Sequence, residues 1–168
     1  VTCRPTWEGG RFDGPEEERR LLLSQALESG AEYVDIEWRA GFDDLIRRRH
    51  GRNVVLSTHD FAGLPDDLDD RYRAMRATGA EVVKVAVAVE SLGEILTLAA
   101  LGCQERPDEK CVVIGMGMAG LPSRVLAGRF GSSWTYAGDA VAPGQLSVDV
   151  LRDQFRFHGI TENTAVYG

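Results

Sequence analysis

Lys84 stands alone inside an apolar run. Residues 82–89 read V-V-K-V-A-V-A-V, the pattern of a strand that is buried on both faces and contains one charge. Burial disfavours the ammonium form and can lower the pKa of a lysine by roughly 3 to 5 units, which leaves a neutral amine that attacks carbonyl carbons. The pattern therefore favours Schiff-base chemistry. A lysine that is paired with a buried carboxylate, or whose stem reaches solvent, would show the same pattern.

His59 is the best placed of the three histidines. It ends the third predicted strand in the sequence L-S-T-H-D-F, whereas His50 follows three arginines on a predicted solvated helix and His158 comes near the end of the last predicted helix. Alone, a histidine at a strand end is typically a hydrogen-bonded structural residue. Beside a lysine on the next strand it gains a second interpretation, because an imine and a general base together can remove a proton next to a carbonyl group.

Charged side chains also follow the first predicted strand, in the sequence T-C-R-P-T-W-E-G-G that begins at residue 2. Glu8 could accept the second N–H of a histidine ring and Arg4 could hold an anionic substrate, with an ordinary loop ion pair as an equal alternative. Asp35 and Glu37 occupy alternate positions of the second predicted strand and therefore share one face. We expect these two carboxylates to pair with a buried basic residue.

The sequence G-M-G-M-A-G at residues 115–120 matches a dinucleotide-binding fingerprint, with Asp139 lying 19 residues beyond the last glycine. The match is weak, because it follows the fifth predicted strand and Pro122 begins the helix only after the third glycine. Nucleotide binding is therefore the least favoured function. Arg124, in the first turn of that helix, suits a substrate carboxylate, with an ordinary surface arginine as the alternative. Gln145 supplies one amide in the loop A-V-A-P-G-Q.

These residues need a framework of alternating strands and helices. Six strand-like segments occur, at residues 1–4, 33–37, 53–57, 82–89, 111–116 and 133–136. Helical patterns follow them, at residues 15–29, 42–49, 65–78, 92–101, 122–130 and 147–157. Repeated βα units predict an α/β fold with a parallel sheet, either doubly wound or part of a β/α barrel. A complete barrel has eight units in about 250 residues, so six units would form an incomplete one.

The composition is that of one globular domain, with 168 residues of which 43% are hydrophobic and 27% charged. The net charge of −7 argues against nucleic-acid and anionic-membrane binding, and no apolar run approaches the roughly 18 residues of a membrane helix. Cys3, Cys103 and Cys111 form no CxxC pair, so neither disulfides nor a zinc site are predicted and a cytoplasmic setting is expected. Because Val1 is not an initiator methionine, we expect a piece of a longer polypeptide.

Six motifs occur in a characteristic order: T-C-R-P-T-W-E-G-G, S-T-H-D-F, V-V-K-V-A, G-M-G-M-A-G-L-P-S-R, F-G-S-S-W-T-Y and A-P-G-Q. Together they resemble type I 3-dehydroquinate dehydratase, and the resemblance covers residues 1–157. It implies a TIM-type β/α barrel of the shikimate pathway that dehydrates 3-dehydroquinate to 3-dehydroshikimate. It also implies a lysine Schiff base that needs neither a metal nor an organic cofactor.

The resemblance implies a role for each site residue. Lys84 would form the imine with the substrate ketone, His59 would move the α-proton and assist the loss of water, and Glu8 would orient His59. Five further residues would contact the substrate, namely Arg124 at its carboxylate, Arg4 and Gln145 at its hydroxyls and polar groups, and Met116 and Met118 as an apolar wall.

Two features depart from the family pattern. Val141 stands where relatives often have a serine, four residues before Gln145, so one hydroxyl contact is expected to be lost. The family's first two strands, with an E-x-R-x-D motif that lines the site, have no counterpart before Val1. The chain thus resembles an open barrel whose exposed edges favour aggregation or pairing into a homodimer. An inactive barrel fragment and another Schiff-base lyase or class I aldolase are the alternatives.

The last residues suggest a second domain. Residues 159–168, G-I-T-E-N-T-A-V-Y-G, resemble the entry to a shikimate dehydrogenase domain, which follows the dehydratase in some bifunctional enzymes. A generic C-terminal tail is the alternative. The expected organisation is a dehydratase barrel over residues 1–157, truncated at its N-terminus, followed by a linker or domain start over residues 158–168.

Overall fold

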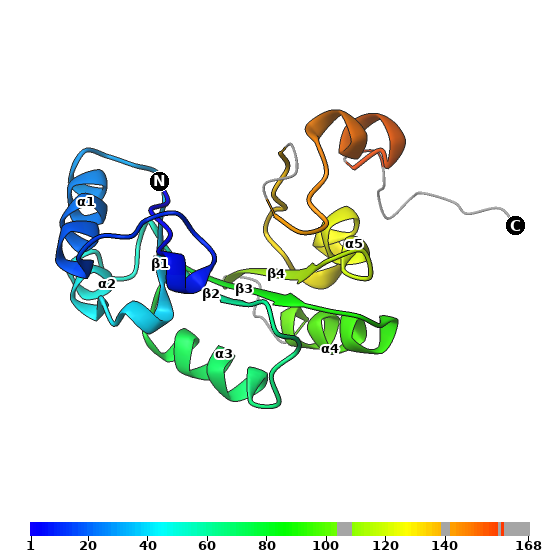
Figure 1. Cartoon of the computed structure of the whole chain (residues 1–168), viewed down its shortest axis with the longest axis horizontal. Coiled ribbons are helices and arrows are strands. Elements are labelled where there is room, and N and C mark those ends of the chain that lie inside the picture. The colour runs from blue at the N-terminus through cyan, green and yellow to red at the C-terminus, as the bar shows by residue number, and fades with distance from the viewer. Residues whose placement is uncertain (104–108, 139–141, 158, 160–168) are drawn as a thin grey trace, which may run out of the picture.

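Four parallel strands form the centre of the computed structural model, which describes residues 1–103, 109–138, 142–157 and 159 (Figure 1). The strands are β1 (Val34–Glu37), β2 (Val54–Asp60), β3 (Val82–Ala88) and β4 (Lys110–Met116). They lie in the order β1-β2-β3-β4, and each neighbouring pair is parallel. The predicted α/β fold with a parallel sheet is confirmed.

Helices alternate with the strands. The α-helices are α1 (Glu16–Glu28), α2 (Asp43–Arg48), α3 (Leu68–Ala77), α4 (Leu92–Gly102) and α5 (Leu121–Val125). Short turns are η1 (Thr6–Glu8), η2 (Trp38–Ala40), η3 (Ala127–Phe130) and η4 (Val150–Gln154), the last of them π-helical. Figure 1 shows α3 and α4 on the same side of the sheet. Over the described ranges, no helix is long and apolar enough to cross a lipid bilayer.

The two faces of the sheet have different partners. On the helix side, the core residues of β3 are Val83, Val85 and Val87, which cluster with apolar side chains of α1 to α4. Val82 and Ala86 belong to a smaller cluster on the opposite face, together with Trp134 and Tyr136. Because side chains alternate along a strand, Lys84 lies on this second face.

The second face also carries the polar residues of the neighbouring strands. Alternation places Asp35 and Glu37 of β1, and Ser57 and His59 of β2, on the same side as Lys84. The strand register sets Ser57 beside Lys84, and Glu37 beside Ser57. The parallel direction of the strands brings their carboxyl ends to one edge of the sheet, so these side chains converge.

Two of the six predicted strands do not form. Residues 1–4 and 133–136 lie beside β1 and β4 respectively, and each edge carries one isolated parallel bridge. The bridges are Thr2–Asp35 and Ser132–Cys111. Pro5 has no backbone N–H to continue the first ladder, and each edge segment pairs with one strand only among the described residues. The two edge segments therefore lie against the sheet, but continuous pairing stops at the four central strands.

The last two predicted helices are shorter than expected. The pattern over residues 122–130 divides into α5 and η3, and Gly128 within it weakens helix propagation. The pattern over residues 147–157 yields only η4. Leu151 is the buried residue of η4, whereas Val148 is 59% exposed, so this segment buries little apolar surface of the kind that stabilises helices in proteins.

Close packing explains two glycines of the 115–120 motif. A Cβ on Gly120 would lie 2.1 Å from the carbonyl oxygen of Gly115, and a Cβ on Gly115 would lie 2.8 Å from the Cα of Gly120. The Ser123 hydroxyl accepts from the Gly115 N–H at 2.8 Å and donates to the Gly120 carbonyl at 2.7 Å. The turn between β4 and α5 thus has a steric need for glycine that is independent of any nucleotide.

Candidate active site

A cavity of about 860 Å³ lies at the carboxyl ends of the strands. Its lining comes from the N-terminal segment, all four strands, α5 and residues 142–145. Six of the eight predicted site residues line it, namely Arg4, His59, Lys84, Met116, Arg124 and Gln145. Segments far apart in the sequence therefore meet around one space large enough for a small molecule.

Lys84 is buried but not alone. Its Nζ donates a hydrogen bond to Oδ2 of Asp35 at 3.0 Å, and both side chains are 7% exposed. The Tyr136 ring lies on another side of the ammonium, with its centroid 4.6 Å from Nζ. Pairing with a buried carboxylate was one of the alternatives left open for this lysine, and the predicted salt-bridge role of Asp35 is confirmed.

Asp35 receives more donors than Lys84 alone. Arg4 Nη2 lies 3.1 Å from Oδ2, and the Ser57 hydroxyl donates to Oδ1. Burial raises the pKa of Asp35, but the charges of Lys84 and Arg4 outweigh burial and bring this pKa to about 2. Asp35 lines the cavity, and the sequence reasoning missed it as a site residue. Asp35 and Glu37 occupy alternate positions of a strand near Lys84 and so share one face, and this pattern could have identified Asp35.

His59 and Glu8 form a buried pair. Oε2 of Glu8 lies 3.0 Å from Nδ1 of His59, and the Arg4 guanidinium contacts the same imidazole. Burial, together with the charges of Lys84 and Arg4, lowers the pKa of His59 to about 2. Burial and the charge of nearby Glu37 raise the pKa of Glu8 to about 8. At neutral pH the two groups therefore share one proton, as a coupled pair.

The shifted pKa values of Glu8 and His59 make the free energy of unfolding depend on pH. Glu8 has its pKa raised from 4.5, so its stabilising contribution is lost as the pH rises towards about 8. His59 has its pKa lowered from 6.5, so its contribution is lost as the pH falls below that value. The pair is expected to favour folding most between pH 4.5 and 6.5, where the two effects cancel. Urea unfolding at pH 5.5 and 8.5 measures the alkaline loss, at most about 1.4 kcal/mol per pH unit.

The matched variant is Glu8→Gln, which has the same shape and no titration. Its unfolding free energy is expected to fall less between pH 5.5 and 8.5 than that of the unaltered chain, because Glu37, whose pKa burial also raises, is common to both. Equal pH slopes in the two proteins would show that Glu8 does not hold its proton in the folded state.

Arg124 is a buried cation that faces the cavity. The residue is 2% exposed, its Nη2 donates to the Pro143 carbonyl at 3.2 Å, and Nε has no hydrogen-bond partner among the described residues. Burial lowers its pKa from the usual value. In the described part of the chain no acidic side chain forms an ion pair with Arg124, so an anionic ligand in the cavity could supply its counter-charge.

The two predicted wall methionines differ. Met116 is 3% exposed and lines the cavity, whereas Met118 is 80% exposed and lies outside the lining. Met118 follows the end of β4 on the turn formed by the Gly117 region, where alternation along the strand no longer directs its side chain inward. The expectation that Met118 forms part of the wall is therefore wrong for this structure. Val141, the expected site of a lost hydroxyl, lies outside the described residues.

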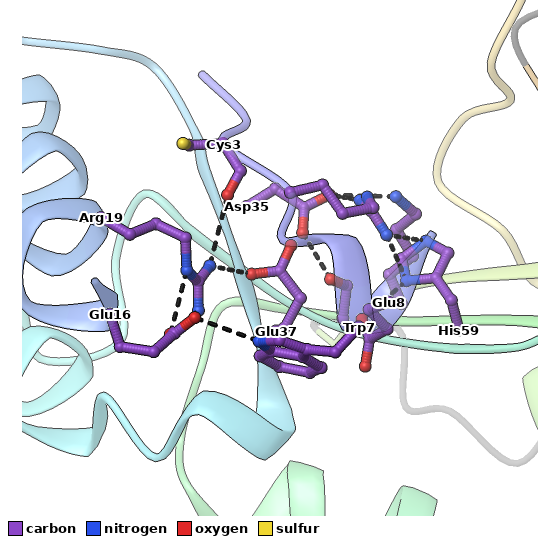
Figure 2. A network of polar contacts seen from close by, with 11 residues as sticks. Cys3, Trp7, Glu8, Glu16, Arg19, Asp35, Glu37 and His59 are labelled. Atoms are coloured by element: carbon purple, nitrogen blue, oxygen red, sulfur yellow. Dashed lines mark hydrogen bonds and ion pairs between the residues drawn. The ribbon is translucent and has the colours of Figure 1, made fainter. Parts of the chain in front are cut away.

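A second buried ion pair lies behind the site, and the sequence reasoning did not identify its cation. Figure 2 shows Arg19 of α1 pointing at Glu37, with Glu16 on its other side. Arg19 also donates to the Cys3 carbonyl at 3.3 Å, and neither Arg19 nor Glu37 is exposed. The predicted pairing of Glu37 with a buried basic residue is thus confirmed. Arg19 looked like one charge among many on an acidic helix start, since only tertiary packing buries it.

The side chains at the cavity suit an anionic carbonyl compound. Arg4 and Arg124 supply cationic donors, Lys84 supplies an amine, and His59 with Glu8 supplies a group that can move a proton. No group of three or more metal-binding side chains gathers in residues 1–103, 109–138, 142–157 and 159. The fold and the site together define a parallel β/α protein with a cavity, lined by a lysine and arginines, at the carboxyl ends of its strands.

Comparison with known proteins identifies the family. The family model described as type I 3-dehydroquinase matches residues 1–162. The chain is 35% identical to the 3-dehydroquinate dehydratase of Methanosarcina barkeri, over 90% of this chain and 69% of that protein. It is 32% identical to the bifunctional 3-dehydroquinate dehydratase/shikimate dehydrogenase of Arabidopsis thaliana, over 99% of this chain and 29% of that protein. The chain belongs to the type I 3-dehydroquinate dehydratase family.

Solved structures of similar fold come from the same family. The type I 3-dehydroquinate dehydratase of Clostridium difficile has a TM-score of 0.82 and 25% identity, over 95% of this chain and 68% of that chain. The enzyme of Geobacillus kaustophilus has a TM-score of 0.82 and 30% identity, over 92% of this chain and 65% of that chain. The chain therefore spans about two thirds of the length of these structures and 29% of the bifunctional relative.

Proposed function

We propose that this chain carries the site of a 3-dehydroquinate dehydratase, a carbon–oxygen lyase that forms 3-dehydroshikimate through a Schiff base on Lys84. The observation that carries the proposal is the convergence of Lys84, His59 and Arg124 on one cavity. Family membership supports it. The solved Clostridium difficile relative, which holds a covalent modified comenic acid, is further support for a covalent step.

In this proposal Lys84 is the nucleophile. Its ammonium passes one proton to water, and the free amine attacks the ketone carbon of the substrate. The carbinolamine takes up a proton at its hydroxyl and loses water, which yields a protonated imine. When the adjacent C–H bond breaks, the protonated imine accepts the electron pair that remains on carbon. The carbanion therefore forms at the α-carbon as an enamine, next to the β-carbon from which the hydroxyl leaves.

His59 moves the protons. The proton that it shares with Glu8 passes to water, which leaves a carboxylate to accept the Nδ1–H, and Nε2 is then free to take the α-proton. The resulting imidazolium gives a proton to the departing hydroxyl, which leaves as water. Hydrolysis of the imine then consumes one water, releases the unsaturated ketone and restores the Lys84 amine.

The remaining lining residues bind the substrate. The Arg124 guanidinium pairs with the substrate carboxylate, and burial strengthens this contact because water screens it little. Arg4 and Gln145 contact hydroxyls and polar groups, and Met116 forms part of the apolar wall. Such a reaction needs neither a metal nor an organic cofactor.

The same proposal extends to the barrel, to pairing of two chains and to a following domain. The four strands with their two edge bridges would be about six of the eight units of a TIM-type barrel, and pairing of two chains would use the open sheet edges. Residues 158–168, of which the structure describes only Gly159, would lead into a shikimate dehydrogenase domain. Similarity to the bifunctional Arabidopsis protein over 99% of this chain supports that arrangement.

An inactive barrel fragment is the second candidate. The chain covers 65% to 68% of two solved relatives, so part of their structure has no counterpart here. Such a fragment would keep the positions of the side chains without turning over the substrate.

Borohydride trapping with 3-dehydroquinate tests the proposal, because the chain has only two lysines, Lys84 and Lys110. Intact mass spectrometry is expected to show one substrate-sized adduct on the unaltered chain and none on Lys84→Arg, since a guanidinium forms no imine under these conditions. Lys84→Arg keeps the positive charge beside Asp35, so its folding is checked by circular dichroism.

Lys110→Arg is the matched control. Lys110 is held as an ammonium by hydrogen bonds to Glu81 and Tyr33, at 2.7 and 2.9 Å, which raise its pKa. This variant is expected to keep the full adduct. An adduct that persists in Lys84→Arg contradicts the assignment of the nucleophile, and a folded chain that forms no adduct supports the inactive fragment.

A further inference from the structure

Within the described ranges, Asp35 is the carboxylate that contacts the amine that would react. Its Oδ2 lies 3.0 Å from Nζ of Lys84, inside a pair whose side chains are each 7% exposed. No role in the reaction proposed above has yet been given to it. The distance means that any imine formed on Nζ would carry its N–H next to this oxygen.

The surroundings of Asp35 decide what it can do there. Arg4 donates to the same oxygen at 3.1 Å, and the Ser57 hydroxyl donates to the other one. Three donors on one carboxylate stabilise its charged form and oppose protonation. Asp35 is therefore a poor acceptor for the proton that the Lys84 ammonium must lose.

We propose that Asp35 is the counter-ion of the protonated imine on Lys84, and that it holds the imine nitrogen in its cationic form during carbon–hydrogen bond cleavage. This inference rests on the proposed function. When the amine becomes an imine, the nitrogen keeps one N–H, and that N–H donates to Oδ2 as the ammonium did. The imine passes no proton to Asp35, so its nitrogen keeps the positive charge until the C–H bond breaks.

The charge on nitrogen is what the reaction requires. A cationic imine accepts the electron pair of the breaking C–H bond and becomes a neutral enamine, whereas a neutral imine would become an anion. A fixed carboxylate beside the nitrogen favours the cationic form before the proton is removed. The Ser57 and Arg4 contacts hold Asp35 in place, so little reorganisation is needed as the charge changes.

Asp35→Asn tests the inference, because asparagine keeps the size and one oxygen acceptor but removes the charge. We expect the Lys84 adduct with borohydride to persist, kcat to fall about 10²-fold or more, and KM to change less than about threefold. Cyanoborohydride reduces cationic imines in preference to neutral ones. The ratio of the cyanoborohydride adduct to the borohydride adduct is therefore expected to fall in this variant.

Asp60→Asn is the matched control, because Asp60 ends β2 in a partly exposed pair with Arg71 and lies outside the cavity lining. It is expected to keep the kcat and the adduct ratio of the unaltered chain. An Asp35→Asn protein with unchanged kcat and unchanged adduct ratio overturns the counter-ion role and leaves the proposed function standing. An unaltered chain without a Lys84 adduct overturns the proposed function itself.

Ser57→Ala provides a second test if Asp35→Asn does not fold. The substitution removes one donor from Asp35 and leaves both its charge and its contact with Lys84. We expect kcat to fall about tenfold with KM unchanged, since a less firmly held carboxylate stabilises the cationic imine less well. A Ser57→Ala protein with the kcat and the adduct ratio of the unaltered chain would overturn the inference.

Discussion

Arg19→Met is expected to lower the free energy of unfolding by about 3 to 5 kcal/mol. The Arg19 guanidinium contacts Glu37, and neither side chain is exposed. Methionine fills much of the same space but leaves the Glu37 carboxylate buried without its cation. Glu37 Oε1 already has no hydrogen-bond partner among the described residues, so little else there compensates the charge. Urea unfolding followed by circular dichroism at pH 7 measures the loss.

The loss is also expected to depend on pH. Burial and the charge of Asp35 raise the pKa of Glu37, while Arg19 lowers it, so removal of Arg19 raises it further. A raised pKa in the folded state means that stability is lost as the pH rises. The destabilisation caused by Arg19→Met should therefore be smaller at pH 5 than at pH 8.

Arg20→Met on the same helix is the matched control. Arg20 is 27% exposed and pairs with Glu17 and Asp44, so its loss is expected to destabilise the fold far less than the loss of Arg19. In the double variant Arg19→Met with Glu37→Leu, much of the stability should return because no unpaired charge remains. Equal losses from Arg19→Met and Arg20→Met would show that burial of the first pair has no energetic consequence.

His59→Asn is expected to lower kcat for dehydration of 3-dehydroquinate by 10²- to 10⁴-fold, the usual contribution of a general acid–base residue. Asparagine approximates the position of one ring nitrogen and cannot accept and return a proton near neutral pH. Steady-state formation of the unsaturated product, followed by its ultraviolet absorbance, measures the effect. The Lys84 adduct is expected to form more slowly but with the same mass.

His50→Asn is the control for this variant. His50 is exposed, lies outside the cavity lining and has a φ of 50°, a left-handed conformation that asparagine tolerates. Its kcat is expected to match that of the unaltered chain. A His59→Asn protein that turns over at the rate of His50→Asn would refute the proton-transfer role of His59.

The class of fold and the central chemistry were accessible from the sequence because they depend on local patterns. An apolar run of strand length predicts a buried strand, and β3 forms over Val82–Ala88 where the pattern places it. The same pattern singled out Lys84 as a charge inside the core. Strand formation at residues 1–4 and 133–136 was harder to predict. Whether a strand continues at the edge of a sheet depends on what pairs with its outer side.

The ion-pair partners that side chains find on other strands could not be predicted from the sequence in the same way. Lys84 and Asp35 are 49 residues apart and meet because β1, β2 and β3 pair in one register. Arg19 and Met118 show the opposite errors of a local interpretation: a charge on a helix that proves fully buried, and an apolar residue that proves 80% exposed. No local pattern distinguishes these positions from their neighbours.

The sequence by itself therefore determined the parallel α/β class and the family, and it singled out Lys84 and His59 as the residues that the proposed function uses. Alternation and hydrophobic runs encode those features within a few residues. Tertiary structure decided which ionisable groups pair with one another: Asp35 with Lys84, Glu37 with Arg19, and Glu8 with His59. Burial and distance set the proton affinities of these groups, and both arise only when separate strands and helices pack together.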